Sequence, residues 1–168
     1  MAYPDHDEKS HAMLTAVPKR WFSWDFTVTE GSQAVAEIDI SWWREKGVLT
    51  VQGVDYRVYR EGLMSGDFII ESSGSVMARA EKPSAFHRSF TINHEDRRYT
   101  LRAKAVFRRT FLLLEGDREI GSLSPEGVFT RRATVDLPQA LPLPVKVFII
   151  WLAVILWKRE SDSAAAAT

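Results

Sequence analysis

Basic residues are concentrated between residues 97 and 132, and three of them have a spacing that could bind phosphate groups. The segment holds nine arginines and lysines against four carboxylates. Arg98, Arg102 and Lys104 alternate with other residues in a stretch patterned like a β-strand, so they share one face. Cations near an anionic membrane surface contribute about 1 kcal/mol each. The spacing therefore predicts a face that binds anionic headgroups.

Two further arginines follow this stretch closely. If the next strand pairs as a hairpin, Arg108 or Arg109 could join the same face. Together with Arg98, Arg102 and Lys104 they are the candidate headgroup-binding residues. The alternative is an ordinary solvated face, on which acidic residues of neighbouring strands pair with these cations.

Other candidates for chemistry have simpler interpretations. His94-Glu95-Asp96 could hold a metal or transfer a proton, but three such side chains in succession are more typical of a turn. Trp42 and Trp43 are neighbours, so on a strand one ring would be buried and the other would lie at the rim or at a membrane or partner contact. Neither a nucleophile elbow nor a carboxylate pair is apparent, and we predict no enzymatic activity.

Composition excludes several classes of protein. The 168 residues include no cysteine, which excludes disulfides, thiolate zinc sites, iron–sulfur clusters and cysteine nucleophiles. The formal net charge is zero, so no overall electrostatic attraction to nucleic acid is expected. We expect no cofactor and no metal, and a monomeric protein.

The candidate residues must be positioned by short strands. Alternation of apolar and polar residues begins near residue 20 and recurs, between turn residues, to about residue 138. We count about eleven strands at intervals of roughly 8–12 residues, a spacing typical of a sandwich or barrel. In the strand at 98–104, Tyr99, Leu101 and Ala103 are predicted to face inward.

A wholly apolar segment follows the strands. Residues 147–157 contain no polar side chain, so a helix here has no polar face and needs protein or lipid all around it. Eleven residues span only about 16 Å, against a bilayer core of about 30 Å. Pro144 suits a first helical turn, and Lys158 and Arg159 suit a helix end. We predict a buried helix over 145–159; a long buried strand or a membrane anchor are the alternatives.

Small residues in the strands indicate where this helix lies. Six alanines occupy positions predicted to face inward: Ala34, Ala36, Ala78, Ala80, Ala103 and Ala105. Small barrels normally fill themselves with side chains, so inward alanines leave room for something else. The predicted fold is therefore a mainly β, closed antiparallel barrel of about 11–12 strands around a buried hydrophobic C-terminal helix. The alternative is a sandwich with the helix on one open face.

The succession of short strands, then Asp136-Leu137-Pro138, then a proline-led apolar helix ending in Trp157-Lys158-Arg159, resembles the tubby C-terminal-like superfamily. That group includes the LURP-one-related proteins and the phospholipid scramblases. The resemblance covers residues 20–159 and implies a barrel of about twelve strands around a central hydrophobic helix. It also implies a lipid-related role, because tubby domains bind phosphoinositides through surface lysines and arginines.

These observations predict one domain at 20–160, with a disordered lead at 1–19 and a disordered tail at 161–168. We expect a non-enzymatic domain that binds anionic phospholipid headgroups or a protein partner. The alternative is a tail-anchored membrane protein with helix 145–159 in lipid. The expected location is the cytoplasm, free, peripheral to a membrane or anchored in one.

Overall fold

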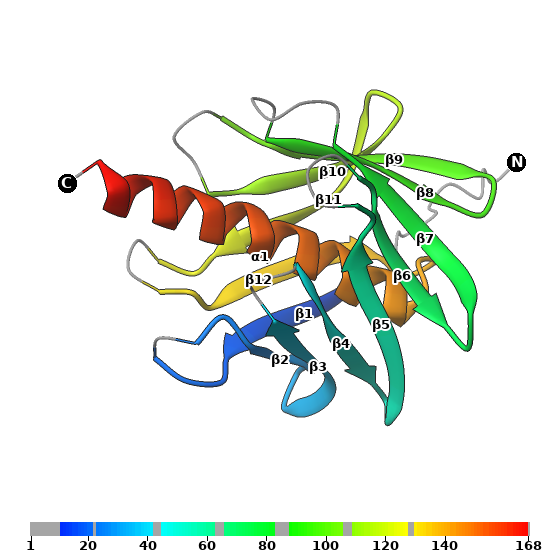
Figure 1. Cartoon of the computed structure of the whole chain (residues 1–168), viewed down its shortest axis with the longest axis horizontal. Helices are drawn as coiled ribbons and strands as arrows, with labels where there is room; N and C mark the ends of the chain where they lie inside the picture. Colours follow the sequence, from blue (N-terminus) through cyan, green and yellow to red (C-terminus); the bar gives the residue numbers. More distant parts are fainter. Residues whose placement is uncertain are drawn as a thin grey trace, which may run out of the picture.

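Twelve antiparallel strands form one closed barrel, and one helix follows them (Figure 1). The computed structural model describes residues 11–21, 23–41, 45–62, 66–82, 88–105, 109–127 and 130–167. The elements are β1 (His11–Pro18), β2 (Phe26–Glu30), β3 (Gln33–Ser41), β4 (Lys46–Val51), β5 (Val54–Arg60), β6 (Phe68–Ser72), β7 (Ser75–Glu81), β8 (Ser89–His94), β9 (Arg97–Ala103), β10 (Phe111–Glu115), β11 (Arg118–Pro125), β12 (Ala133–Pro138) and α1 (Leu143–Ala166).

The strands follow one another around the barrel in chain order, and β1 closes it by pairing with β12. In that closing pair Leu14 lies opposite Val135 and Ala16 opposite Ala133. At one end of the barrel the strands are joined by turns of two residues. At the other end the connections are four to seven residues long. The two ends therefore differ, and only the long-connection end has enough chain to build an irregular surface.

The short turns have a sequence explanation. Gln52-Gly53 and Ser73-Gly74 both have positive φ at each residue, 49° and 81° in the first and 50° and 81° in the second. Two successive positive φ values are the signature of a type I′ turn, whose twist matches that of the flanking strands. The glycine in the second position adopts this conformation without strain, and these turns fix the register of β4 with β5 and of β6 with β7.

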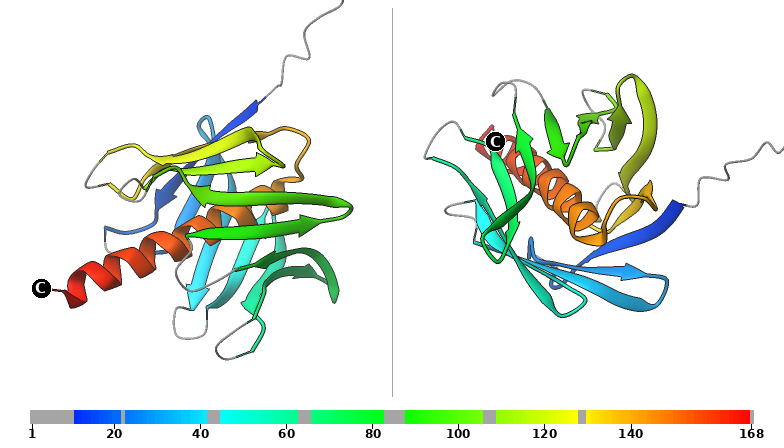
Figure 2. Two further views of the ribbon diagram at one scale, coloured as in Figure 1. Left: turned by 90° about the horizontal axis from the view of Figure 1, so that it is seen from above. Right: turned by 90° about the vertical axis from the view of Figure 1, so that its right-hand side faces the viewer.

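The helix α1 lies inside the ring of strands, as the end-on view in Figure 2 shows. Every residue from Val145 to Trp157 is buried. Pro142 precedes the first helical residue and Pro144 lies in the first turn, where a missing N–H is not needed by the helix. The predicted closed barrel around a buried apolar helix is thus confirmed. The strands, and not a sandwich face, surround residues 145–157.

The centre of the barrel is aromatic. The Trp151 side chain is fully buried, with its ring 5.7 Å from that of Phe68 and 5.8 Å from that of Phe148 between centroids. Phe68 in turn meets Phe90 edge-on at 5.2 Å. Edge-to-face and offset contacts at these distances add to the hydrophobic contribution of each ring. The helix is therefore held by a specific ring contact with β6, which β8 supports through Phe90, as well as by burial.

The prediction about inward alanines is partly right. Ala36, Ala78 and Ala80 are buried, and Ala103 packs partly buried against the core. Ala34 and Ala105 are exposed, so for them the prediction was wrong. A register shift opposite Val28 and Thr29 inserts one extra residue into β3 and turns Ala34 outward. Ala105 lies beyond the end of β9, where strand alternation no longer applies.

The predicted domain limits need two corrections. Residues 11–18 form β1 and belong to the barrel, so the expected disordered lead to residue 19 was wrong for them; residues 1–10 lie outside the described residues. The helix continues past residue 159 to Ala166, where a disordered tail was expected. Alanine has the highest helix propensity, so the four alanines from residue 164 favour continuation of a helix that is already formed.

Lysine occurs inside the barrel at the start of the helix. Lys146 is only 4% exposed, and this burial lowers the pKa of its ammonium group, an effect that the nearby carboxylate of Glu30 opposes.

Among the described residues, no helix combines the length and the apolar character needed to cross a membrane.

Candidate anion-binding site

Arg98 and Arg102 lie on the outer face of β9, as the alternation predicted. Tyr99 and Leu101 between them point into the barrel and are 3% and 0% exposed. Lys104 follows the end of β9, is exposed, and is held in place by its backbone N–H, which donates to the Thr110 carbonyl oxygen at 2.9 Å. We call Arg98, Arg102 and Lys104 together the β9 face.

The strands beside the β9 face present no acidic side chain to it. Asn93 of β8 lies opposite Arg98 and accepts a hydrogen bond from its Nε at 3.2 Å. Arg102 lies between Ser89 of β8 and Leu112 of β10. Within the described part of the chain, none of the three cations of the β9 face has an ion pair. Pairing with neighbouring carboxylates, the simpler interpretation of this face, does not occur among these residues.

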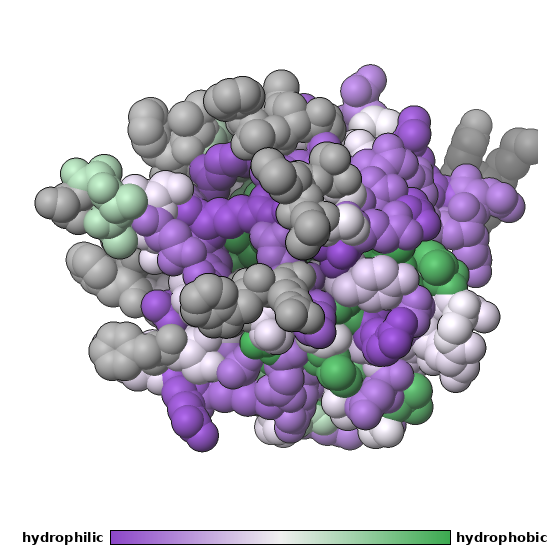
Figure 3. Space-filling model, viewed as in Figure 1, coloured by the Kyte–Doolittle hydropathy of each residue, from purple (hydrophilic) through white to green (hydrophobic). Residues whose placement is uncertain are grey.

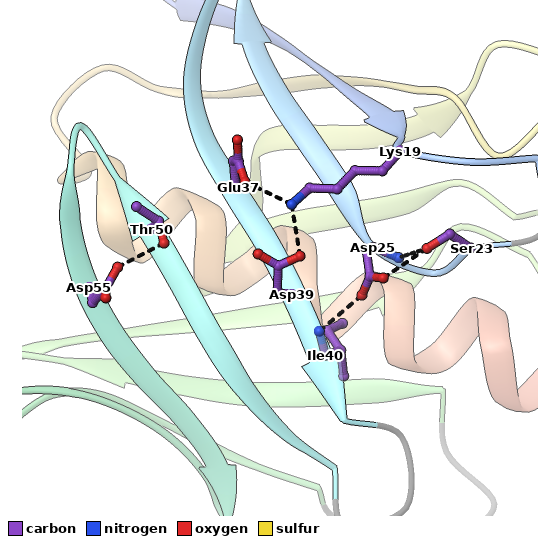
Figure 4. A network of polar contacts seen from close by, with 8 residues as sticks. All are labelled: Lys19, Ser23, Asp25, Glu37, Asp39, Ile40, Thr50 and Asp55. Atoms are coloured by element: carbon purple, nitrogen blue, oxygen red, sulfur yellow. Dashed lines mark hydrogen bonds and ion pairs between the residues drawn. The ribbon is translucent and has the colours of Figure 1, made fainter.

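Most other cations of the barrel are paired. Lys19 is an example: its ammonium group lies 2.7 Å from a carboxylate oxygen of Glu37 and 2.7 Å from one of Asp39, both on the outer face of β3 (Figure 4). The cations with carboxylate partners are Lys19, Arg57, Arg60, Arg79, Arg88, Arg97, Arg118, Arg132, Lys158 and Arg159. The β9 face differs in that its three cations are exposed and lack such partners among the described residues.

The expected contribution of the following strand to the β9 face is not observed. Arg109 lies at the long-connection end of the barrel, with its guanidinium 5.8 Å from the Trp157 ring. Its carbonyl oxygen accepts a hydrogen bond from the Trp157 indole N–H at 2.8 Å. The chain leaves β9 after Ala103 and reaches β10 only at Phe111, so Arg109 belongs to a connection and not to a strand. Arg108 lies outside the described residues.

Arg109 is part of a second group of cations that the sequence prediction missed. This group surrounds the place where α1 leaves the barrel, and we call it the helix-exit collar. Figure 3 shows hydrophilic side chains around that place. Its members are Arg60, Lys82, Arg88, Arg109, Arg131 and Arg159. A sequence signal existed, because Arg60, Lys82 and Arg88 border long connections between strands.

Two carboxylates pair with three of the six collar cations. Glu45 binds Arg159 and also lies 3.0 Å from an Arg60 nitrogen. Glu160 lies 2.8 Å from Arg88. Several of these guanidinium groups also lie over aromatic rings, such as Arg60 at 5.6 Å from Phe68. Ion pairs and cation–π contacts of this kind fix the end of the helix to the rim, so the collar has a structural role.

Burial changes the acidity of two cations in the collar. Desolvation lowers the pKa of Lys82, and the positive charges of Arg159 and Arg60 lower it further. Desolvation likewise lowers the pKa of Arg109, an effect opposed by Glu160 and reinforced by Arg131 and Arg88. These cations are therefore less available to an external anion than the fully hydrated cations of the β9 face.

His94 has a structural role and not a chemical one. It is 7% exposed, and its Nδ1–H donates to the Met77 carbonyl oxygen at 2.8 Å. The turn predicted around it consists of Glu95 and Asp96, which join β8 to β9. The described residues contain no group of three or more histidines and carboxylates arranged to hold a metal ion. Trp42 and Trp43 lie outside the described residues.

Comparison with protein-family models, with curated proteins and with solved structures finds no match to this chain.

Proposed function

We propose that this protein is a non-catalytic domain that binds anionic phospholipid headgroups at a membrane surface through its β9 face. The observation that supports this most directly is that Arg98, Arg102 and Lys104 have no ion pair among the described residues, whereas most other described cations have carboxylate partners. Cations that stabilise nothing locally are available to an external anion.

The geometry of the face favours a surface over a single small anion. Alternate residues of a strand lie about 7 Å apart, so Arg98 and Arg102 are separated by roughly 14 Å along β9. Their side chains project from a convex barrel wall and do not converge on one point. A membrane presents many anionic groups at once and can engage all three cations, each of which lies within a Debye length of about 8 Å of it when the face rests on the surface.

The expected strength follows from the number of cations. At about 1 kcal/mol per cation, three contribute about 3 kcal/mol, or roughly a 100-fold preference for an anionic over a neutral surface. The resemblance to tubby-like proteins supports the same proposal. It implies a barrel of about twelve strands around a hydrophobic helix, and tubby domains bind phosphoinositides through surface lysines and arginines.

The proposal is tested by co-sedimentation of the full chain with vesicles of phosphatidylcholine alone and of phosphatidylcholine with phosphatidylserine. We expect binding only to the second kind, strongest at low ionic strength. Replacing Arg98, Arg102 and Lys104 by glutamine should weaken it about 100-fold. The matched control replaces Lys19, Arg118 and Arg132 by glutamine, which removes the same charge from paired cations and should leave most of the binding intact.

Two results would overturn the proposal. One is a wild-type protein that does not sediment with phosphatidylserine vesicles even at low ionic strength. The other is an equal loss of binding in the two triple variants, since overall charge and not the β9 face would then govern the interaction. Circular dichroism of each variant shows whether the barrel is intact, so loss of the fold is not mistaken for loss of the site.

A further inference from the structure

A pocket of about 450 Å³ lies on the outer wall of the barrel, away from the β9 face. Its volume is within the range of about 300–1,000 Å³ that is typical of small-molecule sites. Residues of three neighbouring strands form it, and five of the seven face outward. The lining residues are Ser41 of β3, Lys46, Gly47 and Val48 of β4, and Arg57, Val58 and Tyr59 of β5.

Gly47 allows the strands under the pocket to approach closely. A Cβ atom at this position would lie 2.3 Å from the Asp39 carbonyl oxygen, far inside van der Waals contact. Any larger residue would therefore push β3 and β4 apart. The floor of the pocket depends on this glycine.

One wall of the pocket is fixed by a buried carboxylate. The Glu71 side chain is 12% exposed and lies on β6, opposite Arg57 of β5. One of its oxygens lies 2.5 Å from Arg57, and the other accepts a hydrogen bond from the Tyr59 hydroxyl at 2.8 Å. The Arg57 guanidinium also lies 5.7 Å from the Tyr59 ring. Arg57 and Tyr59 are thus held as one preorganised wall, which lowers the entropic cost of binding a ligand.

Among the described lining residues, one cation remains available to a ligand. Glu71 neutralises Arg57, whereas Lys46 has no ion pair within the described residues. No carboxylate lines the pocket, and Ser41 adds a hydroxyl group. A single available positive charge matches a monoanion better than a phosphate dianion, because a second negative charge would remain unpaired.

The remaining surface of the pocket is apolar and aromatic. Val48 is 39% exposed, an unusual exposure for a large apolar side chain in this barrel. The Tyr59 ring and the planar Arg57 guanidinium offer surfaces on which a flat ring can stack. We propose that this pocket binds a small aromatic monocarboxylate, with the carboxylate on Lys46 and Ser41 and the ring against Val48 and Tyr59.

The experiment titrates the isotopically labelled full chain with 2-naphthoate and follows amide chemical shifts. We expect saturable shifts in β4 and β5 around Lys46, Val48 and Tyr59. Replacing Lys46 by glutamine should weaken the affinity about tenfold, through loss of a charge-assisted contact. The control Arg118→Gln removes the same charge from β11, on the other side of the barrel, and should leave naphthoate affinity unchanged.

Uncharged 2-naphthamide supplies the same ring without the carboxylate and should bind at least about tenfold more weakly. The proposal is overturned if 2-naphthoate causes no saturable shift in β4 and β5, if the amide binds as well as the acid, or if Lys46→Gln binds like the wild type. Lys46→Gln should still bind phosphatidylserine vesicles, so this result and that of the vesicle experiment are independent.

Discussion

The outer faces of β9 and β3 lie six strands apart by either route around the barrel, and therefore on opposite sides of it. Both carry like charges on one face of a strand, two residues apart on β3 and four residues apart on β9. On β3, Glu37 and Asp39 share one lysine, Lys19, which bonds to both. On β9, Arg98 and Arg102 have no carboxylate partner among the described residues.

The two faces differ in the role of their charges. Those on β3 form ion pairs that stabilise the barrel, whereas those on β9 remain available to an external anion. Exposed ion pairs contribute roughly 0.2–1 kcal/mol each, so the β3 carboxylates and Lys19 make a modest local contribution to stability. Like charges without partners contribute nothing of this kind and repel one another weakly. Both faces present like charges from the outer side of one strand, and the presence or absence of a counter-charge distinguishes them.

The largest expected effect on stability comes from a substitution that unfolds the barrel carrying both faces. Trp151→Asp places an unpaired charge at the centre of the barrel and removes the ring contacts with Phe68 and Phe148. The combined cost is roughly 6–10 kcal/mol, comparable to the whole stability of a domain. Soluble yield and circular dichroism should show no folded protein. Ala164→Asp, in the exposed end of the helix, is the control and should fold normally.

A smaller effect is expected when the β9 face is made to resemble the β3 face. Ser89 lies opposite Arg102, so Ser89→Glu supplies the missing partner without removing any cation. The added negative charge lowers the net charge of the β9 face by one, which should weaken binding to phosphatidylserine vesicles by about 1 kcal/mol, or roughly fivefold. Thr15→Glu adds the same charge on β1 and serves as the control. Equal binding by Ser89→Glu and the wild type would contradict the assignment of the site.

The smallest effect concerns stability. Lys19→Met leaves Glu37 and Asp39 unpaired, and we expect a loss of about 1 kcal/mol in the free energy of unfolding, or about 2–4 °C in Tm. Arg98→Met removes no ion pair and should change stability by less than about 0.5 kcal/mol. Urea titration of both variants measures the difference. Equal losses of stability would contradict the difference in ion pairing between the two faces.

The pH dependence of this loss has a defined sign. Partial burial alone would lower the pKa of Lys19, but hydrogen bonds and charge from Asp39 and Glu37 outweigh it, and the pKa is raised above the ordinary 10.5. The stabilisation that comes from a raised folded-state pKa is fully present below pH 10.5. It is lost as the pH rises through the folded-state pKa. The difference between the wild type and Lys19→Met should therefore persist at neutral pH and shrink above pH 10.5.

Alternation and one apolar segment were enough to predict the barrel and its helix, because both signals are local. The outward position of Arg98 and Arg102 followed from the same period of two. By contrast, β1 was missed because apolar and polar residues alternate only weakly in its sequence. This strand is formed by pairing with β12 and β2. Bulges were also missed: an extra residue in β3 exposes Ala34, and nothing in its immediate sequence indicates this.

The sites were harder to predict than the strands. Arg109 was assigned to the wrong place because the path of a seven-residue connection is decided by contacts with the rim, such as its bond to Trp157, and not by local pattern. The helix-exit collar gathers residues from connections that are far apart in the chain. The pocket over β3, β4 and β5 depends on the buried carboxylate of Glu71, whose partners are known only once β5 and β6 are paired.

The position of α1 has a consequence for how the chain folds during its synthesis. The segment that fills the middle of the molecule, Val145–Trp157, follows every strand in the chain, and β1 must wait for β12 before the ring can close. Pairing between such distant segments is slow, and unfinished barrels expose apolar surface that favours aggregation. Hairpins can form as the ribosome releases them, but the core can be completed only after translation has passed residue 157.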